Sequence, residues 1–238
     1  MWKYTAVLIE PRKHKALEFV LRNFIENLSD EWKILIFHGR QNKEFIQEII
    51  LRNEFEDRID KLIQLDVDNL SIAQYNRMLI NPSFYKCIVT DIMLIFQTDT
   101  MILRENRNLI NDFLEYDYVG SPWKNVEMVG NGGLSLRRKS KMIEICEYYE
   151  DRMKDPEVDK KLTKFLDDNN EDVMISLQKT IYIYTPEFKK AVYFGMETVY
   201  NERSFGIHCI WKHFTETEME KVLKRYPEIK IVMELNKL

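Results

Sequence analysis

Residues 92–100, "IMLIFQTDT", change abruptly from apolar to polar. Five apolar residues in succession are typical of a strand that is buried on both faces of a sheet. Gln97, Thr98 and Asp99 follow at once, where that strand would have its carboxyl end. Ligands of parallel sheets bind outside the carboxyl ends of the strands. The sequence therefore predicts a buried strand that leads directly into a binding site.

Segments with strand and helix character alternate before this point. Further strands are predicted at residues 3–10, 32–39 and 58–66, and helices at 17–28, 42–52 and 71–80. The first helix has its apolar side chains at the i, i+3, i+4, i+7 spacing of an amphipathic helix. Ser71 can cap the third helix, and Asn81-Pro82 can end it. This alternation predicts an α/β fold with a mixed, mostly parallel sheet and helices on both faces.

The second half of the chain has a less regular pattern. Residues 117–123 and 129–140 are rich in glycine, so we expect loops there. A helix is predicted at 142–149, and a highly charged surface helix at 151–170. The basic run at 137–139 is expected at a solvated strand end, where one side chain could also meet a phosphate.

Length and charge limit the classes of protein. The 238 residues are enough for a substantial core, and we predict one domain over 1–238. Its sheet-forming half is 1–100, and its loop-rich half is 101–238. The net charge of -4 implies no general affinity for nucleic acid or anionic membranes. No run approaches the roughly 20 apolar residues of a membrane span.

Cysteine usage and the N-terminus point to a compartment. Cys87, Cys146 and Cys209 are far apart and include no CxxC pair, so neither a disulfide framework nor a structural zinc site is predicted. The apolar run near the N-terminus is too short for a secretory signal. We expect a cytoplasmic protein.

Two short segments could form a binding site. Asp99 can hold a divalent cation through one carboxylate oxygen, or it can cap the following turn. Asn131, Gly132 and Gly133 tolerate positive φ, which suits either backbone packed against a ligand or an ordinary tight turn. The second segment lacks the GxGxxG pattern, so a dinucleotide fingerprint is not supported.

Later residues offer a base, a metal ligand and two aromatic platforms. Glu171 and Asp172 begin a helix, where acids are favoured by the helix dipole, but one of them could serve as a general base. His208 could complete a metal site with Asp99, or it could be a packed histidine. Trp123 and Trp211 could stack on a sugar ring or belong to the core.

The order of these segments resembles that of one protein family. "VLIEPR", "WKILIFHG", "IFQTDT", "EYDYVGSPW", "VGNGGLSLR", "NEDV" and "FGIHCIW" are similar, in sequence and spacing, to uncharacterised glycosyltransferase-like proteins of large DNA viruses, fungi and other microbes. The resemblance covers roughly residues 5–213. It implies the Rossmann-like GT-A fold of nucleotide-sugar transferases, with a DxD motif and a late histidine that bind Mn²⁺ or Mg²⁺. The expected cytoplasmic location would then include the cytoplasm of a virus-infected host cell.

The resemblance also implies roles for individual residues. Asp99 would be the last acid of the DxD motif, His208 the late metal ligand, and Asp172, with Glu171 beside it, the base. Residues 1–100 would form the nucleotide-binding half, and 101–238 the half for donor sugar and acceptor. The residues implied around the donor are Glu10, Arg12, Asn76, Arg77, Gln97, Thr98, Asp99, Asn131, Gly132 and Gly133.

The implied reaction is transfer of a sugar from a nucleoside-diphosphate donor, UDP by expectation from the class, to a hydroxyl of a glycan, protein or small molecule. Because the base lies opposite the leaving group, inversion is expected. Gln97 departs from the motif, since a neutral amide replaces its first acid. A degenerate domain that binds sugar nucleotide or a partner without catalysis is therefore an alternative. Another metal-dependent, nucleotide-processing enzyme would need clustered carboxylates, and Asp91 is a full strand away from Asp99.

Overall fold

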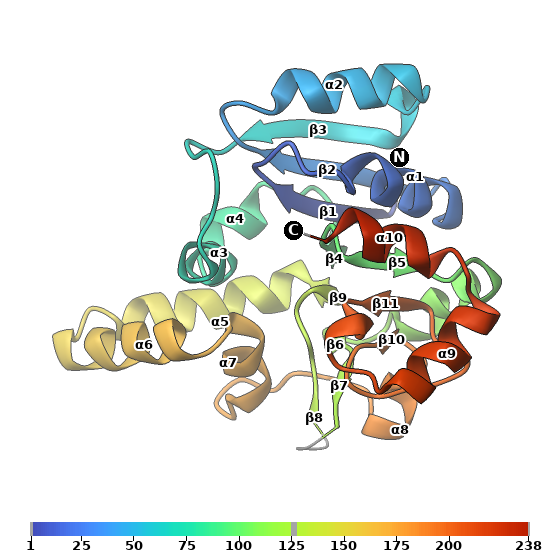
Figure 1. Ribbon diagram of the computed structural model, residues 1–238. Coiled ribbons are helices and arrows are strands. Elements are labelled where there is room, and N and C mark those ends of the chain that lie inside the picture. The colour runs from blue at the N-terminus through green and yellow to red at the C-terminus, as the bar shows by residue number, and fades with distance from the viewer. Residues whose placement is uncertain (1, 125–127, 238) are drawn as a thin grey trace.

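The computed structural model describes residues 2–124 and 128–237, and a six-stranded sheet lies at its centre (Figure 1). The strand order is β3-β2-β1-β4-β9-β6. The bounds are β1 Tyr4–Glu10, β2 Trp32–His38, β3 Ile59–Gln64, β4 Ile92–Phe96, β6 Tyr118–Gly120 and β9 Leu134–Arg138. β1 to β4 are parallel, whereas β9 runs antiparallel to both β4 and β6. The four predicted strands and the mixed, mostly parallel sheet are confirmed.

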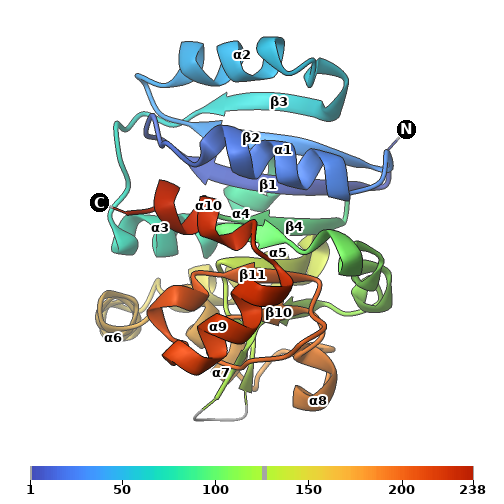
Figure 2. The same ribbon diagram turned by 45° about the vertical axis from the view of Figure 1, so that its right-hand side comes forward.

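Helices cover both faces of this sheet because side chains alternate along its buried strands. On one face, Leu8 and Leu94 belong to a hydrophobic cluster with Phe24 of α1 (Leu17–Asn27) and Val232 of α10 (Ile229–Leu235). Figure 2 shows α1 and α10 side by side over this face. α2 (Lys43–Arg52) and α9 (Glu216–Arg225) contribute to the same cluster.

The other face of the sheet forms a second hydrophobic cluster. Val7 and Ile95, which alternate with the residues of the first face, pack there with Tyr85 and Met142. The helices on this side are α3 Ile72–Leu79, α4 Pro82–Lys86, α5 Lys139–Arg152, α6 Pro156–Asp168 and α7 Glu171–Leu177. Ser71 caps α3 as predicted, since its side chain accepts a hydrogen bond from the backbone N–H of Gln74.

Loops were expected at 117–123 and 129–140, and this expectation is wrong in part. β6 and β9 extend the central sheet, and β7 (Pro122–Trp123) pairs with β8 (Met128–Val129). The sequence "LSLRR" of β9 alternates, with Leu134 and Leu136 buried on the face of α1. The glycines before this strand and the two arginines at its end concealed the strand pattern.

A small second sheet brings the end of the chain back to the end of β4. Its strands are β5 Thr100–Ile102, β10 Gly195–Met196 and β11 Gly206–His208, in the order β10-β11-β5. β5 begins directly after Asp99, and it pairs antiparallel with β11 so that His208 lies opposite Thr100. The remaining elements are α8 Phe188–Ala191 and the 3-10 helices η1 Glu56–Arg58, η2 Arg104–Phe113 and η3 Ile210–Lys212. Within the described ranges, no helix is both long and apolar enough to cross a membrane.

Candidate active site

A cavity of about 590 Å³ lies at the carboxyl ends of β1 and β4. It is lined by the turn after β4, residues 131–133 before β9 (the glycine loop), the start of α7 and the end of β11. The predicted site residues that line it are Glu10, Arg12, Asn76, Gln97, Thr98, Asp99, Asn131, Gly132, Gly133, Glu171, Asp172 and His208. The structure thus brings together residues that are up to about 200 positions apart in the sequence.

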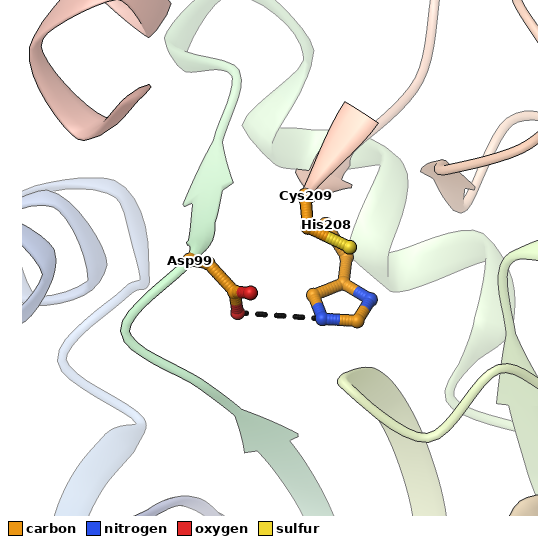
Figure 3. Close-up of side chains that lie close together, drawn as sticks. All are labelled: Asp99, His208 and Cys209. Carbon is orange, nitrogen blue, oxygen red and sulfur yellow. Dashed lines mark ion pairs between the residues drawn. The ribbon is translucent and has the colours of Figure 1, made fainter. Parts of the chain in front are cut away.

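Asp99 and His208 lie next to each other in the lining of this cavity. The Asp99 Oδ1 atom lies 3.3 Å from Nε2 of His208, and Figure 3 shows the carboxylate directed at the edge of the imidazole. The pairing of β5 with β11 explains this approach, and the backbone N–H of Cys209 also donates to the Asp99 carbonyl at 3.0 Å. The pair is largely buried, with side-chain exposures of 17% and 10%.

The second nitrogen of His208 faces two acceptors. Its Nδ1 atom lies 3.0 Å from Oδ1 of Asn131 and 3.4 Å from Oε1 of Glu197. Because neither oxygen carries a proton when Glu197 is ionised, Nδ1 must donate, and Nε2 is directed to Asp99. A histidine whose Nδ1–H is held in this way is the usual form of a histidine metal ligand.

Burial and two neighbouring cations have opposite effects on the pKa of Asp99. Burial would raise the pKa of this carboxyl, but the hydrogen bond and charge of His208, together with Lys212, outweigh burial and lower it to about 2. Lys212 Nζ lies 3.4 Å from the second carboxylate oxygen, Oδ2. Burial also lowers the pKa of His208, yet its hydrogen bonds to Asp99, Cys209 and Glu197 raise it well above the ordinary value. Asp99 is therefore an anion that is shared between two cations.

The glycine loop joins this pair to the acids of α7. A Cβ atom at Gly133 would overlap the imidazole of His208, so only glycine allows the ring to lie there. The backbone N–H of Gly132 donates to Oδ2 of Asp172 at 2.7 Å. Asn131 accepts from the Gly133 N–H at 3.0 Å while it also orients His208. Three consecutive residues thus position the imidazole and the carboxylate relative to each other.

Asp172 has the properties of a base that works near neutral pH. Burial, and to a smaller extent the charge of neighbouring Glu171, raise its pKa to about 7. The hydrogen bonds from Gly132 and Val173 and the charge of Arg137 act in the opposite direction without reversing the shift. A group with this pKa can both accept and release a proton near pH 7.

Glu171 is committed to a buried ion pair. Its Oε1 atom accepts from Nη2 of Arg137 at 2.8 Å, and the two side chains are 3% and 0% exposed. Arg137 also donates to Ser135 and to the Tyr85 hydroxyl. The expectation of a solvated end for residues 137–139 is therefore wrong at Arg137, which is inside because Glu171 neutralises it.

Other predicted residues have mainly structural contacts. Glu10 binds Arg12 through both carboxylate oxygens, at 2.8 Å each, on the rim of the cavity. The hydroxyl of Thr98 donates to the same carboxylate at 3.4 Å. Asn76 lines the cavity, but its amide donates to the Asn169 carbonyl at 3.2 Å and so ties α3 to the end of α6.

Three predicted residues lie elsewhere. Arg77 pairs with Asp167 on the surface, at 3.0 Å between Nη2 and Oδ1, because the helical turn that points Asn76 inward points its neighbour outward. Trp211 packs against the hydrophobic core, and Trp123 lies in β7 outside the cavity lining. The structure does not bring these three side chains to the site.

Sequence reasoning missed several residues that line the cavity. They include His14, Ser71, Tyr75, Lys212 and Asn236. Asn236, near the C-terminal end of α10, donates to the Thr98 carbonyl at 2.9 Å. Tyr75 lies in the helix predicted at 71–80, but no role in a site was predicted for it. The turn at Cys209 and the 3-10 helix η3 place the ammonium of Lys212 beside Asp99, and no local spacing in the sequence indicates this.

The donor set around Asp99 fits a divalent cation. The carboxylate oxygen of Asp99 is a ligand of Mn²⁺, and Nε2 of His208 becomes one when the metal ion displaces its proton; their separation of 3.3 Å allows one ion to contact both. Gln97 lines the same wall, where it offers an amide oxygen in place of a second carboxylate. Such a site has fewer protein charges than one built from two acids.

The sequence of the chain matches one known protein family. The family described as "Protein of unknown function (DUF5672)" matches residues 61–208, which is more than half of the sequence. The chain belongs to this family. Among curated proteins, none matches it.

Solved structures show which fold this is. Two structures of the glycosyltransferase GlyE from Streptococcus pneumoniae TIGR4 match 98% of this chain and 63% of theirs, at 15% identity. The TM-scores are 0.56 for the apo form and 0.53 for the other structure. S. aureus TarS 1–349 with UDP-GlcNAc matches less well, with TM-score 0.42, 12% identity, and coverage of 60% of this chain and 47% of that one. The chain spans about half to two-thirds of these structures. Its likeness to GlyE shows that its fold is that of the GT-A glycosyltransferases.

Proposed function

We propose that this protein is a glycosyltransferase that moves a sugar from a nucleoside-diphosphate donor to an acceptor hydroxyl. One observation carries the proposal: residues 131–133 contact both Asp172, whose pKa is about 7, and the imidazole of the Asp99–His208 pair in one cavity. The GT-A fold supports the same reaction. Residues 1–100 would bind the nucleotide, and 101–238 the sugar and the acceptor.

The donor would bind along the carboxyl ends of β1 and β4. Glu10 and Arg12 offer a carboxylate and a guanidinium at the rim, which can hydrogen-bond a nucleobase and ribose. The ammonium of Lys212 and the Asp99–His208 pair lie where the diphosphate would be held. We take UDP as the nucleotide from the class of enzyme.

A divalent cation bound by Asp99 and His208 would stabilise the negative charge that develops on the leaving diphosphate. Asn131 and Glu197 contribute indirectly, since their oxygens fix the tautomer of His208 and direct its Nε2 atom into the cavity.

Asp172 would take the proton of the acceptor. The acceptor oxygen forms a bond to the anomeric carbon, the electrons of the carbon–oxygen bond to phosphate leave with the diphosphate, and the hydroxyl proton passes to Asp172. Attack from the face opposite the diphosphate inverts the anomeric centre. Glu171 does not compete for this role, because its carboxylate is held by Arg137.

Binding of nucleotides tests the first half of this proposal. UDP, GDP, CDP and dTDP are added to the purified chain with and without Mn²⁺, and the melting temperature is recorded. A ligand that binds only the native state must raise this temperature. We expect UDP to give the largest increase, and more with Mn²⁺ than without. The absence of any increase with all four nucleotides would overturn donor binding.

Release of nucleoside diphosphate from a panel of sugar nucleotides tests the second half. Asp99→Ala should weaken donor binding, and Asp172→Asn should lower turnover while leaving the melting shift with UDP intact. Asp167→Asn, on the outer surface beside Arg77, is the matched control and should retain activity. Full activity in both site variants would show that the assignments are wrong.

Gln97 favours a second function, binding of a sugar nucleotide without catalysis. The amide provides no negative charge to hold a cation beside Asp99. This function predicts a melting shift with UDP but no release of UDP from any sugar nucleotide in the presence of acceptors. It also predicts that Gln97→Asp increases the effect of Mn²⁺ on UDP binding.

A further inference from the structure

A second group of metal-ligand side chains lies on the Nδ1 side of His208. It consists of Glu197, Cys209 and His213, whose ligand atoms all lie within 4.8 Å of one another. Sγ of Cys209 is 3.8 Å from Nε2 of His213, and Oε1 of Glu197 is 3.7 Å from the same nitrogen. No role in the proposed transfer uses Cys209 or His213.

The fold brings these three residues together from two strands and a short helix. β10 is parallel to β11 with Met196 opposite Ile207, so Glu197 comes to lie beside His208. Cys209 follows with a φ of 36°, in the left-handed region that disfavours residues other than glycine. This turn starts η3, which carries His213 back toward the sulfur. Unfavourable backbone of this kind persists where the surrounding structure requires it, often at functional sites.

The carboxylate of Glu197 gives independent evidence for a ligand. The residue is 5% exposed, and its Oε2 atom has no hydrogen-bond partner among the residues that the structure describes. Its other oxygen, Oε1, faces His208 and His213 at 3.4 and 3.7 Å. A buried oxygen without a hydrogen-bond partner is unfavourable, and more so when it is charged. A cation bound beside it would remove this penalty.

We propose that Glu197, Cys209 and His213 bind a zinc ion. With Zn–S and Zn–N bonds of about 2.3 and 2.1 Å, tetrahedral angles separate the ligand atoms by about 3.3 to 3.6 Å. The separations of 3.7 and 3.8 Å in the fold need only small side-chain movements to reach these values. Sulfur selects zinc over Mg²⁺, Ca²⁺ and Mn²⁺, which prefer oxygen.

Charge and access also suit this ion. The thiol loses its proton to solvent when the metal binds, so one thiolate and one carboxylate neutralise the two charges of Zn²⁺ in a buried place. His213 is 36% exposed at its side chain, which leaves an approach for the ion and for a water as fourth ligand. When Glu197 turns to the metal, Asn131 remains as the acceptor for Nδ1 of His208. The site does not depend on the proposed transferase function.

Cobalt absorption tests the site directly. The full chain is freed of metal with a chelator and titrated with Co²⁺, whose thiolate complexes absorb in the near ultraviolet. We expect the band to saturate at one equivalent and to disappear when Zn²⁺ is added. Cys209→Ser should abolish it, and Glu197→Gln and His213→Gln should each weaken Co²⁺ binding at least about tenfold. Cys87→Ser, a half-buried cysteine elsewhere, is the control and should keep the band.

Cys209 is also within reach of Asp99 and His208, so two more variants decide which group holds the ion. Asp99→Asn should keep the cobalt band, whereas His213→Gln, at the exposed edge, should weaken it without loss of folded structure by circular dichroism. The opposite pattern would assign the sulfur to the Asp99 site and overturn the proposal. No thiolate band in the wild-type chain, or one unchanged in His213→Gln, would overturn it as well.

Discussion

Asp172→Asn removes a buried ionisation, so its effect on stability must depend on pH. The pKa of Asp172 is about 7 in the folded chain, against an ordinary value of 3.8. Between these values the folded state keeps a proton that the unfolded state has lost. The stability of the wild-type chain therefore falls as pH rises through this window, and asparagine, which stays neutral, escapes that loss. Glu171, Arg137 and Tyr118 are the ionisable groups that face the carboxyl.

The difference between the two pKa values corresponds to about 4 kcal/mol in total, at 1.36 kcal/mol for each pKa unit. Of this, about 2.5 kcal/mol falls between about pH 5 and about pH 8. The amide nitrogen of asparagine also replaces an oxygen that accepts from the N–H of Gly132 or Val173. That loss is worth about 1–3 kcal/mol at every pH and cancels when two pH values are compared.

Urea unfolding at about pH 5 and about pH 8, without divalent cations, measures the effect. We subtract the free energy of unfolding of the wild type from that of Asp172→Asn. This difference should be more positive by about 2.5 kcal/mol at the higher pH, because only the wild type loses stability. Asp167→Asn makes the same chemical change at the surface, and its pH-dependent difference is subtracted. A corrected difference that is the same at both pH values would refute the raised pKa and, with it, the reason for choosing Asp172 as the base.

Three further predictions concern the same cavity. Gly133→Ala should displace the ring of His208, so the extra melting shift that Mn²⁺ gives with UDP should vanish; an unchanged shift would contradict the metal assignment. Arg137→Met should lower the free energy of unfolding by about 3–5 kcal/mol, because it leaves Glu171 buried and unpaired, and adding Glu171→Gln should recover part of it. Release of nucleoside diphosphate should rise with pH and level off above about 7, as Asp172 loses its proton, and a flat profile would argue against this base.

The parts of the fold that could be predicted are those set by local pattern. β1, β2 and β4 are apolar runs that are buried on both faces, and α1 has a regular apolar face. β9 could not be predicted in this way. Its Arg137 is favourable inside only because Glu171 lies opposite, and no local pattern encodes a partner 34 positions away. A charged residue in a sequence is predicted to be exposed to solvent unless its partner is known.

Some residues of the candidate site could also be predicted from local sequence, and others could not. Asp99 was predictable because it closely follows the end of a buried strand, where ligands of such sheets bind. The glycines at 132 and 133 were predictable as unusual, but their neighbours His208 and Asp172 come from elements that only the fold brings near. Glu197 had no signal of its own, since the register of β10 against β11 decides where it lies.

Gln97 raises the question of how a site with one acid fewer binds a diphosphate, and Lys212 gives a physical answer. Its ammonium lies 3.4 Å from Oδ2 of Asp99 and is 59% exposed, so it can turn to a phosphate oxygen at little cost. A second carboxylate at position 97 would repel a diphosphate unless a cation covered it, whereas an amide does not. UDP should therefore raise the melting temperature even without added cation, and Lys212→Ala should reduce this cation-free increase more than the increase measured with Mn²⁺. Equal losses in both conditions would mean that Lys212 holds the nucleotide independently of the charge at Asp99.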